Sequence, residues 1–340
     1  MPWEAAKVEQ KNSHKKEETM KKIIKNNYRE LSVIVAIAVM FIIFGILNPI
    51  YISSSNIVDI LDQATIYGLM GIGMTMVIIT GGIDLSVGSV LALSGCIVAN
   101  MAVKGLNPVL CLIVGLFAGF AFGLLNGLLV SRMKLQPFIA TMGTMSVYRG
   151  AAYIITEGYP VLGVPDSFRN ILNIKIVGGI RISVLVFIAF AILVYILLRK
   201  TRLGTYIYAI GGNMEAARLS GVRVELTQTM AYAIGMLGTA LAGLIQVAKL
   251  GTGDPTTGNG WELNAIAAAA IGGTSMAGGR GNALGTVLGA ILFSGLKVGL
   301  IVLNVNTYYQ YVATGLVIII AAYLEIFQGA IASRKKKKVV

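Results

Sequence analysis

Apolar runs of about 20 residues recur along this 340-residue chain and restrict what it can fold into. As an α-helix, a run of that length crosses the roughly 30 Å hydrocarbon core of a bilayer. Only 13% of the residues are charged and the mean hydropathy is +0.78, whereas soluble domains contain about 25% charged residues. The sequence therefore predicts an all-α fold, a polytopic transmembrane helix bundle.

Nine runs have this character, and an odd number of spans would place the two chain ends on opposite sides of the membrane. Both ends are basic, however, and basic clusters beside spans mark the cytoplasmic side. A tenth, short or broken span is therefore expected at residues 262–279, giving about ten spans with both termini cytoplasmic. The nine runs cover residues 31–48, 57–80, 85–103, 108–130, 137–155, 182–198, 226–248, 284–303 and 310–330.

The distribution of charge divides the chain into three regions. Residues 1–30 are predicted to be a basic disordered cytoplasmic tail, residues 31–330 the transmembrane domain, and residues 331–340 a second basic cytoplasmic tail. A net charge of +13 also suggests nucleic-acid binding. Because the basic residues flank lipid-length helices and form no separate domain, we expect membrane lipid around the chain and no nucleic acid as a partner.

Residues with enzyme chemistry are scarce. His14 is the only histidine, and Cys96 and Cys111 both lie in apolar runs, so neither a metal site nor a Ser/His/Asp set is predicted. The chain has no phosphate loop of the form GxxxxGK[ST]. We therefore expect no enzymatic activity and no cofactor, which leaves a transporter, a channel or a membrane scaffold.

The polar string GGIDLSVGS, residues 81–89, interrupts the membrane portion. Gly81 and Gly82 allow a helix to end, and an acid in a membrane is costly and usually functional. We predict a helix break inside the bundle, with Asp84 starting the next helix and capping its free N–H groups. Ser86 and Ser89 are expected to hydrogen-bond locally or to a neighbouring helix. The break is either a tight structural turn or a border of a translocation path.

The membrane portion contains five other acids that are more easily placed at the interface between membrane and water: Asp59, Asp62, Glu157, Glu262 and Glu325.

The long connection at residues 199–225 is expected on the cytoplasmic side. A short helix over 213–218 is predicted, with Asn213 as its N-cap, Glu215 in its first turn and Gly221 as its stop. Met214, Ala217 and Leu219 are candidates to contact a partner, the alternative being a solvated loop helix.

Four stretches, in order, resemble the membrane permease of ribose-type monosaccharide ABC importers: residues 81–95, 126–150, 208–222 and 261–290. The resemblance extends over residues 31–330. It implies a subunit of the bacterial inner membrane that moves a monosaccharide or small polyol inward. It also implies three partners: cytosolic ABC ATPase subunits, an extracytoplasmic sugar-binding protein, and a second permease copy or a related permease that completes the pore.

The resemblance also implies which residues act. This chain departs from the family pattern at two positions: Asn264 stands where related sequences usually have Asp, and Trp261 stands where tyrosine is common. If this stretch faces the pathway, the sugar preference is expected to differ from that of those relatives. Two alternatives remain: a branched-chain amino-acid-type ABC permease, against which GGIDLSVGS argues, and a self-contained secondary carrier, which would normally have more intramembrane acids. The residues implied for ATPase coupling are Asn213, Met214, Glu215, Ala216, Ala217, Arg218 and Leu219. Those implied for the translocation pathway or helix break are Gly81, Gly82, Asp84, Ser86, Asn126, Phe138, Thr141, Glu262 and Asn264.

Overall fold

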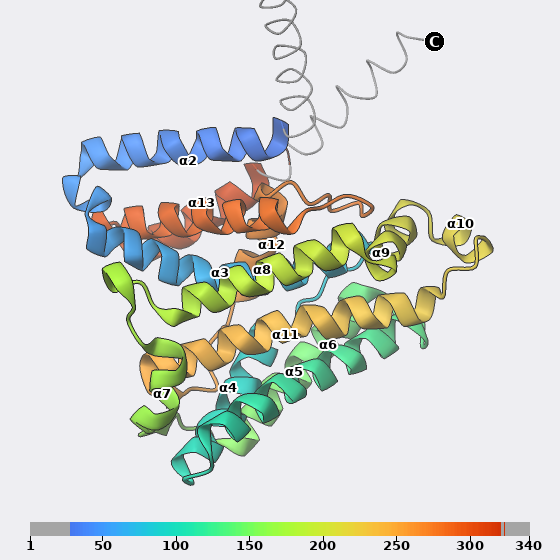
Figure 1. Ribbon diagram of the computed structural model, residues 1–340, viewed down its shortest axis with the longest axis horizontal. Helices are drawn as coiled ribbons and strands as arrows, with labels where there is room; N and C mark the ends of the chain where they lie inside the picture. Colours follow the sequence, from blue (N-terminus) through green and yellow to red (C-terminus); the bar gives the residue numbers. More distant parts are fainter. Residues whose placement is uncertain (1–27, 321–322, 324–340) are drawn as a thin grey trace, which may run out of the picture.

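The computed structural model describes residues 28–320 and 323, and its fold is a helix bundle (Figure 1). Every predicted span contains a helix. The expected tails, apart from residues 28–30, lie outside the described residues, as does Glu325. The described helices are α2 (Tyr28–Leu47), η1 (Pro49–Ile52), α3 (Ser54–Ile79), α4 (Val87–Val103), α5 (Pro108–Ser131), α6 (Pro137–Ile155), α7 (Asp166–Asn173), η2 (Val177–Gly179), α8 (Ile182–Lys200), α9 (Arg202–Gly212), α10 (Met214–Leu219), α11 (Val224–Leu250), α12 (Trp261–Ile271), α13 (Ala283–Val302) and a last helix over Thr307–Ile320.

Six of the helices in the described part of the chain are long and apolar enough to cross a membrane: α2, α3, α5, α8, α11 and α13. Helices α4 and α12 and the last helix are apolar but shorter. The segment at 262–279, predicted to be short or broken, is helical only to Ile271 and then turns. The chain is thus a polytopic helical membrane protein with several helices shorter than a regular span.

Helix α3 lies at the centre of the bundle and packs against α8, α11, α12 and α13. Of its most apolar 18-residue window, 94% is buried. Gly73 allows a close approach of α3 to α11, because a Cβ there would overlap the carbonyl of Gly235 on α11. By contrast, only 17% of the α2 window and 22% of the α5 window are buried. These two helices present their apolar side chains outward, as expected of a lipid-facing surface.

Asparagine and serine side chains cap the N-termini of several helices. Ser53 caps α3, Asn107 caps α5 and Asn282 caps α13, each accepting a backbone N–H of the first turn. A free N–H at a helix end cannot be satisfied by lipid, so side-chain caps stabilise these starts.

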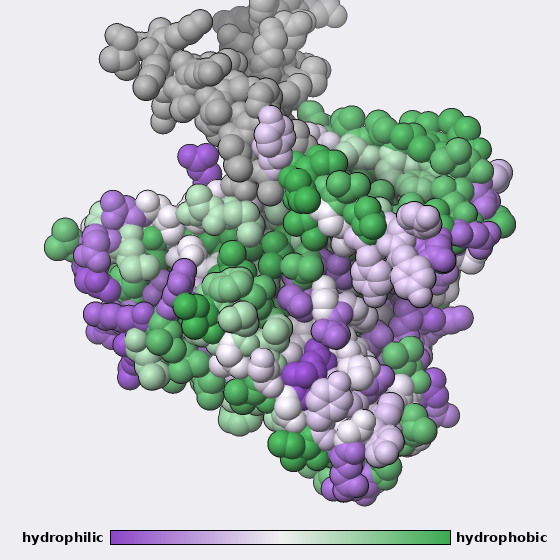
Figure 2. Space-filling model, turned by 180° about the vertical axis from the view of Figure 1, so that it is seen from behind, coloured by the Kyte–Doolittle hydropathy of each residue, from purple (hydrophilic) through white to green (hydrophobic). Residues whose placement is uncertain are grey.

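The bundle has two distinct ends. Helix α10 protrudes at one end and α7 lies at the other (Figure 1). Figure 2 shows hydrophilic side chains gathered at the end that bears α10 and a broad hydrophobic surface on the side where α2 lies. At the α7 end, strand β1 (Val161–Leu162) pairs antiparallel with β2 (Thr252–Gly253).

At the α10 end, the Tyr208 hydroxyl on α9 donates to the carbonyl of Gly281 (2.7 Å) and so attaches the turn after α12 to α9. Burial raises the pKa of this hydroxyl, so it remains a hydrogen-bond donor.

Candidate functional site

The predicted break in GGIDLSVGS is present, but α4 begins later than predicted. Helix α3 ends at Ile79 and α4 begins at Val87. The prediction that Asp84 starts the helix and caps it is therefore wrong. The Asp84 Oδ1 atom instead accepts from the backbone N–H (2.8 Å) and the hydroxyl (2.7 Å) of Ser86, two residues on. This Asx-type turn orders the loop before α4, and Asp84 does not cap the N-terminus of that helix.

The two glycines of the break have different physical roles. Gly81 has φ +85°, a backbone conformation that residues with a side chain rarely adopt. Gly82 is confined by packing, because a Cβ there would overlap the hydroxyl of Tyr232 on α11. The paired glycines therefore combine a left-handed turn with a close approach of the loop to α11.

Asn126 joins this loop to α5. Its amide nitrogen donates to Asp84 Oδ2 (2.9 Å) and to the Ser86 hydroxyl oxygen (2.8 Å). Its carbonyl oxygen accepts from the hydroxyl of Tyr148 on α6 (3.0 Å). Asp84, Ser86 and Asn126 are 0% exposed, so this network replaces the hydrogen bonds that water would otherwise provide.

Thr141 attaches the same loop to α6. Its Oγ1 accepts from the backbone N–H of Leu85 (3.1 Å), and its hydroxyl lies within hydrogen-bond distance of the carbonyls of Pro137 (2.8 Å) and Ile83 (3.2 Å). We call Asp84, Ser86, Asn126, Thr141 and Tyr148 the break cluster. It is a buried polar site built from three separate parts of the chain.

The other predicted pathway residues lie on α6 and α12, and their side chains take no part in the hydrogen bonds of the break cluster. Phe138, near the start of α6, is 48% exposed. Glu262 and Asn264 belong to α12, where Asn264 is buried and the carboxylate of Glu262 lies close to Gly88. Ser89, expected to form a hydrogen bond, is buried with no partner for its hydroxyl among the described residues.

Sequence analysis missed Tyr148 and Tyr232, two tyrosines in apolar runs. Both are at least 96% buried, and both lie close enough to Asp84 to interact with it electrostatically. A tyrosine inside a helix bundle usually finds a partner for its hydroxyl, which is the available signal for Tyr148. The Tyr232 hydroxyl has no hydrogen-bond partner among the described residues.

A second buried acid was misplaced by the sequence analysis. Asp62 on α3 is 4% exposed and forms an ion pair with Arg181, which immediately precedes α8. Lys249, near the end of α11, lies 3.8 Å from the same carboxylate oxygen. Asp62 is thus buried inside the α7 end of the bundle, where its two cationic neighbours offset its charge. The signal in the sequence was the presence of basic residues such as Arg181 in the connection before α8, which was expected on the outer side of the membrane and could supply a partner for a buried acid.

The predicted short helix is α10, and Asn213 caps it by accepting the backbone N–H of Ala216 (2.9 Å). Gly221 follows the helix with φ +83°. Leu219 is 88% exposed, but Ala217 is buried against Ile210 and Val224. The expectation that Ala217 is offered to a partner is therefore wrong, because its methyl group packs α10 onto the bundle.

Arg218 on α10 forms two surface ion pairs, with Glu215 (3.0 Å) and with Glu225 at the start of α11 (3.0 Å). Met214 is 37% exposed at the other end of the same helix. Helix α10 thus presents a charged and apolar surface at one end of the molecule. Over residues 28–320 and 323, no group of His, Cys, Asp and Glu side chains is arranged to hold a metal ion.

Fold and site together define a multi-pass helical membrane protein with a buried polar break and an exposed short helix at one end. A family model described as "Branched-chain amino acid transport system / permease component" matches residues 56–322. The chain belongs to this family of ABC permeases and, within it, to the ribose-type sugar permeases. The predicted resemblance is confirmed.

Three curated relatives illustrate the similarity. The ribose import permease protein RbsC of Bacillus subtilis is 41% identical over 298 residues, which cover 87% of this chain and 92% of that protein. RbsC of Escherichia coli K12 is 38% identical over 86% of this chain and 92% of its own length. The D-allose transport system permease protein AlsC of E. coli K12 is 38% identical over 85% of this chain and 89% of its own. No solved structure gave a significant match.

Proposed function

We propose that this chain is the membrane-spanning subunit of an ATP-driven importer that moves a monosaccharide or a related small polyol into the cell. The observation that carries the proposal is the similarity, over at least 85% of the chain, to permeases named for ribose and D-allose. The autoinducer 2 permease LsrC of Photorhabdus luminescens, 33% identical over 88% of this chain and 90% of its own length, widens the substrate class. The named substrates favour a sugar over a branched-chain amino acid.

The pore is proposed to form from two permease subunits, either two copies of this chain or this chain and a related one. Separate ATPase subunits in the cytosol supply the energy, and an extracytoplasmic sugar-binding protein delivers the substrate. The chain itself is proposed not to be an enzyme. Residues 31–330 form the permease domain in the bacterial inner membrane, between two basic cytoplasmic tails.

Helix α10 is proposed as the contact to the ATPase, within a cytoplasmic segment of residues 199–225. Its support is geometric: a capped helix stands at one end of the bundle with Leu219 exposed to 88%. An apolar side chain so exposed at a polar end of the molecule suits a protein contact better than lipid. Arg218 pairs with Glu215 on the same helix and with Glu225 on α11, so one of these surface ion pairs links α10 to the rest of the bundle.

The break cluster is proposed to border the translocation path. Irregular backbone inside a bundle is tolerated where it lines a cavity or is buried in protein. Phe138, Glu262 and Asn264 are proposed as further pathway residues on α6 and α12.

Reconstitution into liposomes tests the proposal. The permease, the ATPase and the binding protein are assembled, and accumulation of a panel of labelled sugars, polyols and branched-chain amino acids is measured. We expect ATP-dependent accumulation of a sugar or polyol only when all three proteins are present. An ATPase with its phosphate-loop lysine replaced is the matched control. Accumulation by the permease alone, driven by a proton or sodium gradient, would show that it is a secondary carrier.

A further inference from the structure

Arg149 is a charged side chain on α6 that lies outside the break cluster. It is partly buried in the second half of this predicted span, and a charge within a membrane segment is costly and usually functional. Its guanidinium donates to the backbone carbonyls of Pro255 and of Thr257 (2.8 Å). Both acceptors belong to residues 251–260, which run from the end of α11 through β2 to the start of α12 and which we call the β2 connection. Arg149 therefore attaches the β2 connection to α6.

The same helix holds the loop before α4. Thr141 and Tyr148, two members of the break cluster, lie on α6, and Arg149 directly follows Tyr148. The β2 connection also touches the start of α4, because a Cβ at Gly258 would overlap the carbonyl of Gly88. The two interruptions of the bundle are thus joined by α6 and by direct contact with each other.

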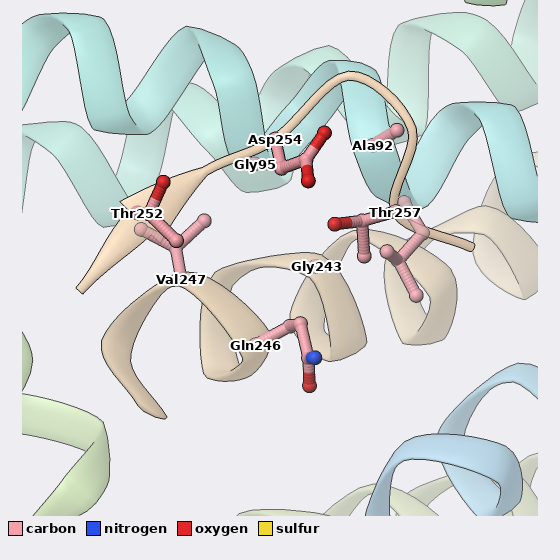
Figure 3. A pocket seen from close by; sticks show the side chains of 9 residues that line it. Ala92, Gly95, Gly243, Gln246, Val247, Thr252, Asp254 and Thr257 are labelled. Carbon is pink, nitrogen blue, oxygen red and sulfur yellow. The ribbon is translucent and has the colours of Figure 1, made fainter. Parts of the chain in front are cut away.

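The underside of the β2 connection is incompletely packed. A small pocket with room for about one water molecule separates it from α4 and α11 (Figure 3). The buried hydroxyl of Thr252 has no hydrogen-bond partner among the described residues, and Figure 3 shows the amide of Gln246 directed away from this space. A segment packed in this way opens at a lower cost in free energy than the close-packed helices around it.

Both ends of the β2 connection are glycines in the left-handed conformation. Gly251 ends α11 with φ +70°, and Gly260 precedes α12 with φ +78°. Glycine tolerates changes in its backbone angles that other residues resist, and hinges are often small residues at the ends of helices or strands. The connection can therefore move while α11 and α12 stay in place.

Two carboxylates lie near the guanidinium of Arg149. Asp254 in the connection and Glu262 in the first turn of α12 are close enough to interact with it electrostatically. Among the described residues, neither carboxylate forms an ion pair with Arg149, so its hydrogen bonds go to neutral carbonyls. A guanidinium released from these carbonyls has a carboxylate nearby to accept its hydrogen bonds, and such charge-assisted bonds are strong.

We propose that Arg149 is a positioning residue for transport, which latches the β2 connection to α6 in this structure and exchanges its carbonyl acceptors for the carboxylate of Glu262 when the connection lifts during the transport cycle. The inference rests on the proposed function. Because α6 also holds the break cluster, the latch ties movement of the connection to the segment that is proposed to border the translocation path.

Thiol labelling in the complete complex of permease, ATPase and binding protein reports the position of the connection. The reporter is Thr257→Cys, because Thr257 is partly buried and Arg149 binds its backbone carbonyl, which the substitution keeps. The native cysteines are buried and are removed by Cys96→Ala and Cys111→Ala. Asn259→Cys, exposed in the same connection, is the matched control. We expect ATP to accelerate labelling at position 257 several-fold and to leave the rate at position 259 unchanged.

Arg149→Gln and Arg149→Lys separate the charge from the hydrogen bonds. Glutamine lacks the charge, so labelling at position 257 without ATP should be about tenfold faster, the effect of losing a charge-assisted hydrogen bond. Uptake should fall, because the latched state is no longer favoured. Both carbonyls bind the same guanidinium nitrogen, so a lysine ammonium can replace it. Arg149→Lys should therefore restore slow labelling without ATP and part of the uptake.

Glu262→Gln tests the exchange of partners. It leaves the latch to Pro255 and Thr257 in place, so labelling at position 257 without ATP should be as slow as in the unmodified complex. The acceleration by ATP should be lost, because the lifted connection no longer leaves Arg149 a carboxylate on α12. A purely structural role of Arg149 would not make ATP-dependent labelling depend on Glu262. If Arg149→Gln does not insert, Glu262→Gln and the unmodified reporter decide the matter.

The outcomes distinguish the latch from the proposed function. If the unmodified complex accumulates a sugar or polyol while labelling at position 257 stays slow in ATP, the latch is overturned and the proposed function stands. Unchanged labelling in Arg149→Gln would also overturn the latch. Failure of the unmodified complex to accumulate any sugar or polyol would instead overturn the proposed function.

Discussion

The amide nitrogen of Asn126 donates to Asp84 Oδ2 (2.9 Å) and to the Ser86 hydroxyl oxygen (2.8 Å), and the carboxylate of Asp84, which only accepts, fixes which end of the amide faces it. The amide oxygen therefore faces the hydroxyl of Tyr148 (3.0 Å), which also lies 3.1 Å from the carbonyl of Phe122 on α5. One chain of buried hydrogen bonds therefore joins α6, α5 and the break between α3 and α4. In such a network every donor faces an acceptor, and a change at one position is transmitted to the next.

The first prediction exploits this order of donors and acceptors. Asp84→Asn leaves one amide to satisfy both Ser86 and Asn126. Its oxygen can accept from Ser86, but its nitrogen then faces the donor of Asn126. We expect a loss of about 1–3 kcal/mol in the free energy of unfolding, seen as a lower melting temperature in detergent.

The exchange Asp84→Asn with Asn126→Asp restores the pairing, because the carboxylate introduced on α5 accepts from the amide introduced in the loop and from Tyr148. We expect the double variant to recover most of the melting temperature. If uptake recovers with stability, the break cluster is structural. If the exchange restores stability but not uptake, the position of the charge serves the pathway. A double variant no more stable than the single ones would contradict the network.

The second prediction concerns Gly82 and Tyr232. Gly82→Ala pushes a methyl group into the Tyr232 hydroxyl, and overpacking of this kind costs about 1–3 kcal/mol. Tyr232→Phe removes a buried hydroxyl that has no partner among the described residues, so alone it should leave stability unchanged or higher. Combined with Gly82→Ala, it should recover most of the lost melting temperature.

Gly81→Ala is the matched control for this pair. A Cβ there meets no atom within 4 Å, but φ is +85°, so the cost comes from the backbone. Tyr232→Phe should not rescue it. Equal rescue of both alanine variants would show that Tyr232 does not determine the need for glycine at position 82.

The sequence was most informative where structure depends on neighbouring residues. The helix at α10 followed from a cap at Asn213 and a stop at Gly221, both local signals. The break at residues 81–89 was predicted for the same reason, but the start of α4 was misplaced because Asp84 turns onto Ser86 instead of the helix.

Contacts between distant parts of the chain depend on how the helices pack, and the sequence carries little information on this. The resemblance placed Asn126 among the candidates without revealing that it bonds Asp84. Asp62 was assigned to an interface because its partner, Arg181, lies far along the chain in a connection with no regular pattern. The pocket beside Asp254 has no sequence signature, since it depends on how the loop after β2 folds over α4 and α11.

The third prediction concerns the buried charge at Asp62. Arg181→Met removes the closer cation, so the carboxylate is left poorly compensated, and the free energy of unfolding should fall by about 3–5 kcal/mol. Lys249→Met should cost less, because Lys249 lies 3.8 Å away and its side chain is 35% exposed. Asp62→Asn combined with Arg181→Met should be closer to the unmodified protein than Arg181→Met alone. Melting temperatures in the same detergent rank the variants. A larger loss for Lys249→Met would contradict the assignment of Arg181 as the main partner.

The fourth prediction separates folding from coupling on α10. Leu219→Ser changes a side chain that is 88% exposed, so the free energy of unfolding should stay within about 0.5 kcal/mol. Glu215→Ala with Arg218→Ala removes exposed ion pairs, each worth at most about 1 kcal/mol. If α10 contacts the ATPase, both variants should insert normally but bind the ATPase more weakly and lose substrate-stimulated hydrolysis.

Leu162→Ser makes the same chemical change as Leu219→Ser but at the α7 end, where the side chain is 70% exposed, and should have no effect on ATPase binding or hydrolysis. Affinity for the ATPase and rates of hydrolysis in liposomes provide the measurement, and unchanged coupling in both α10 variants would place the ATPase contact elsewhere on the protein.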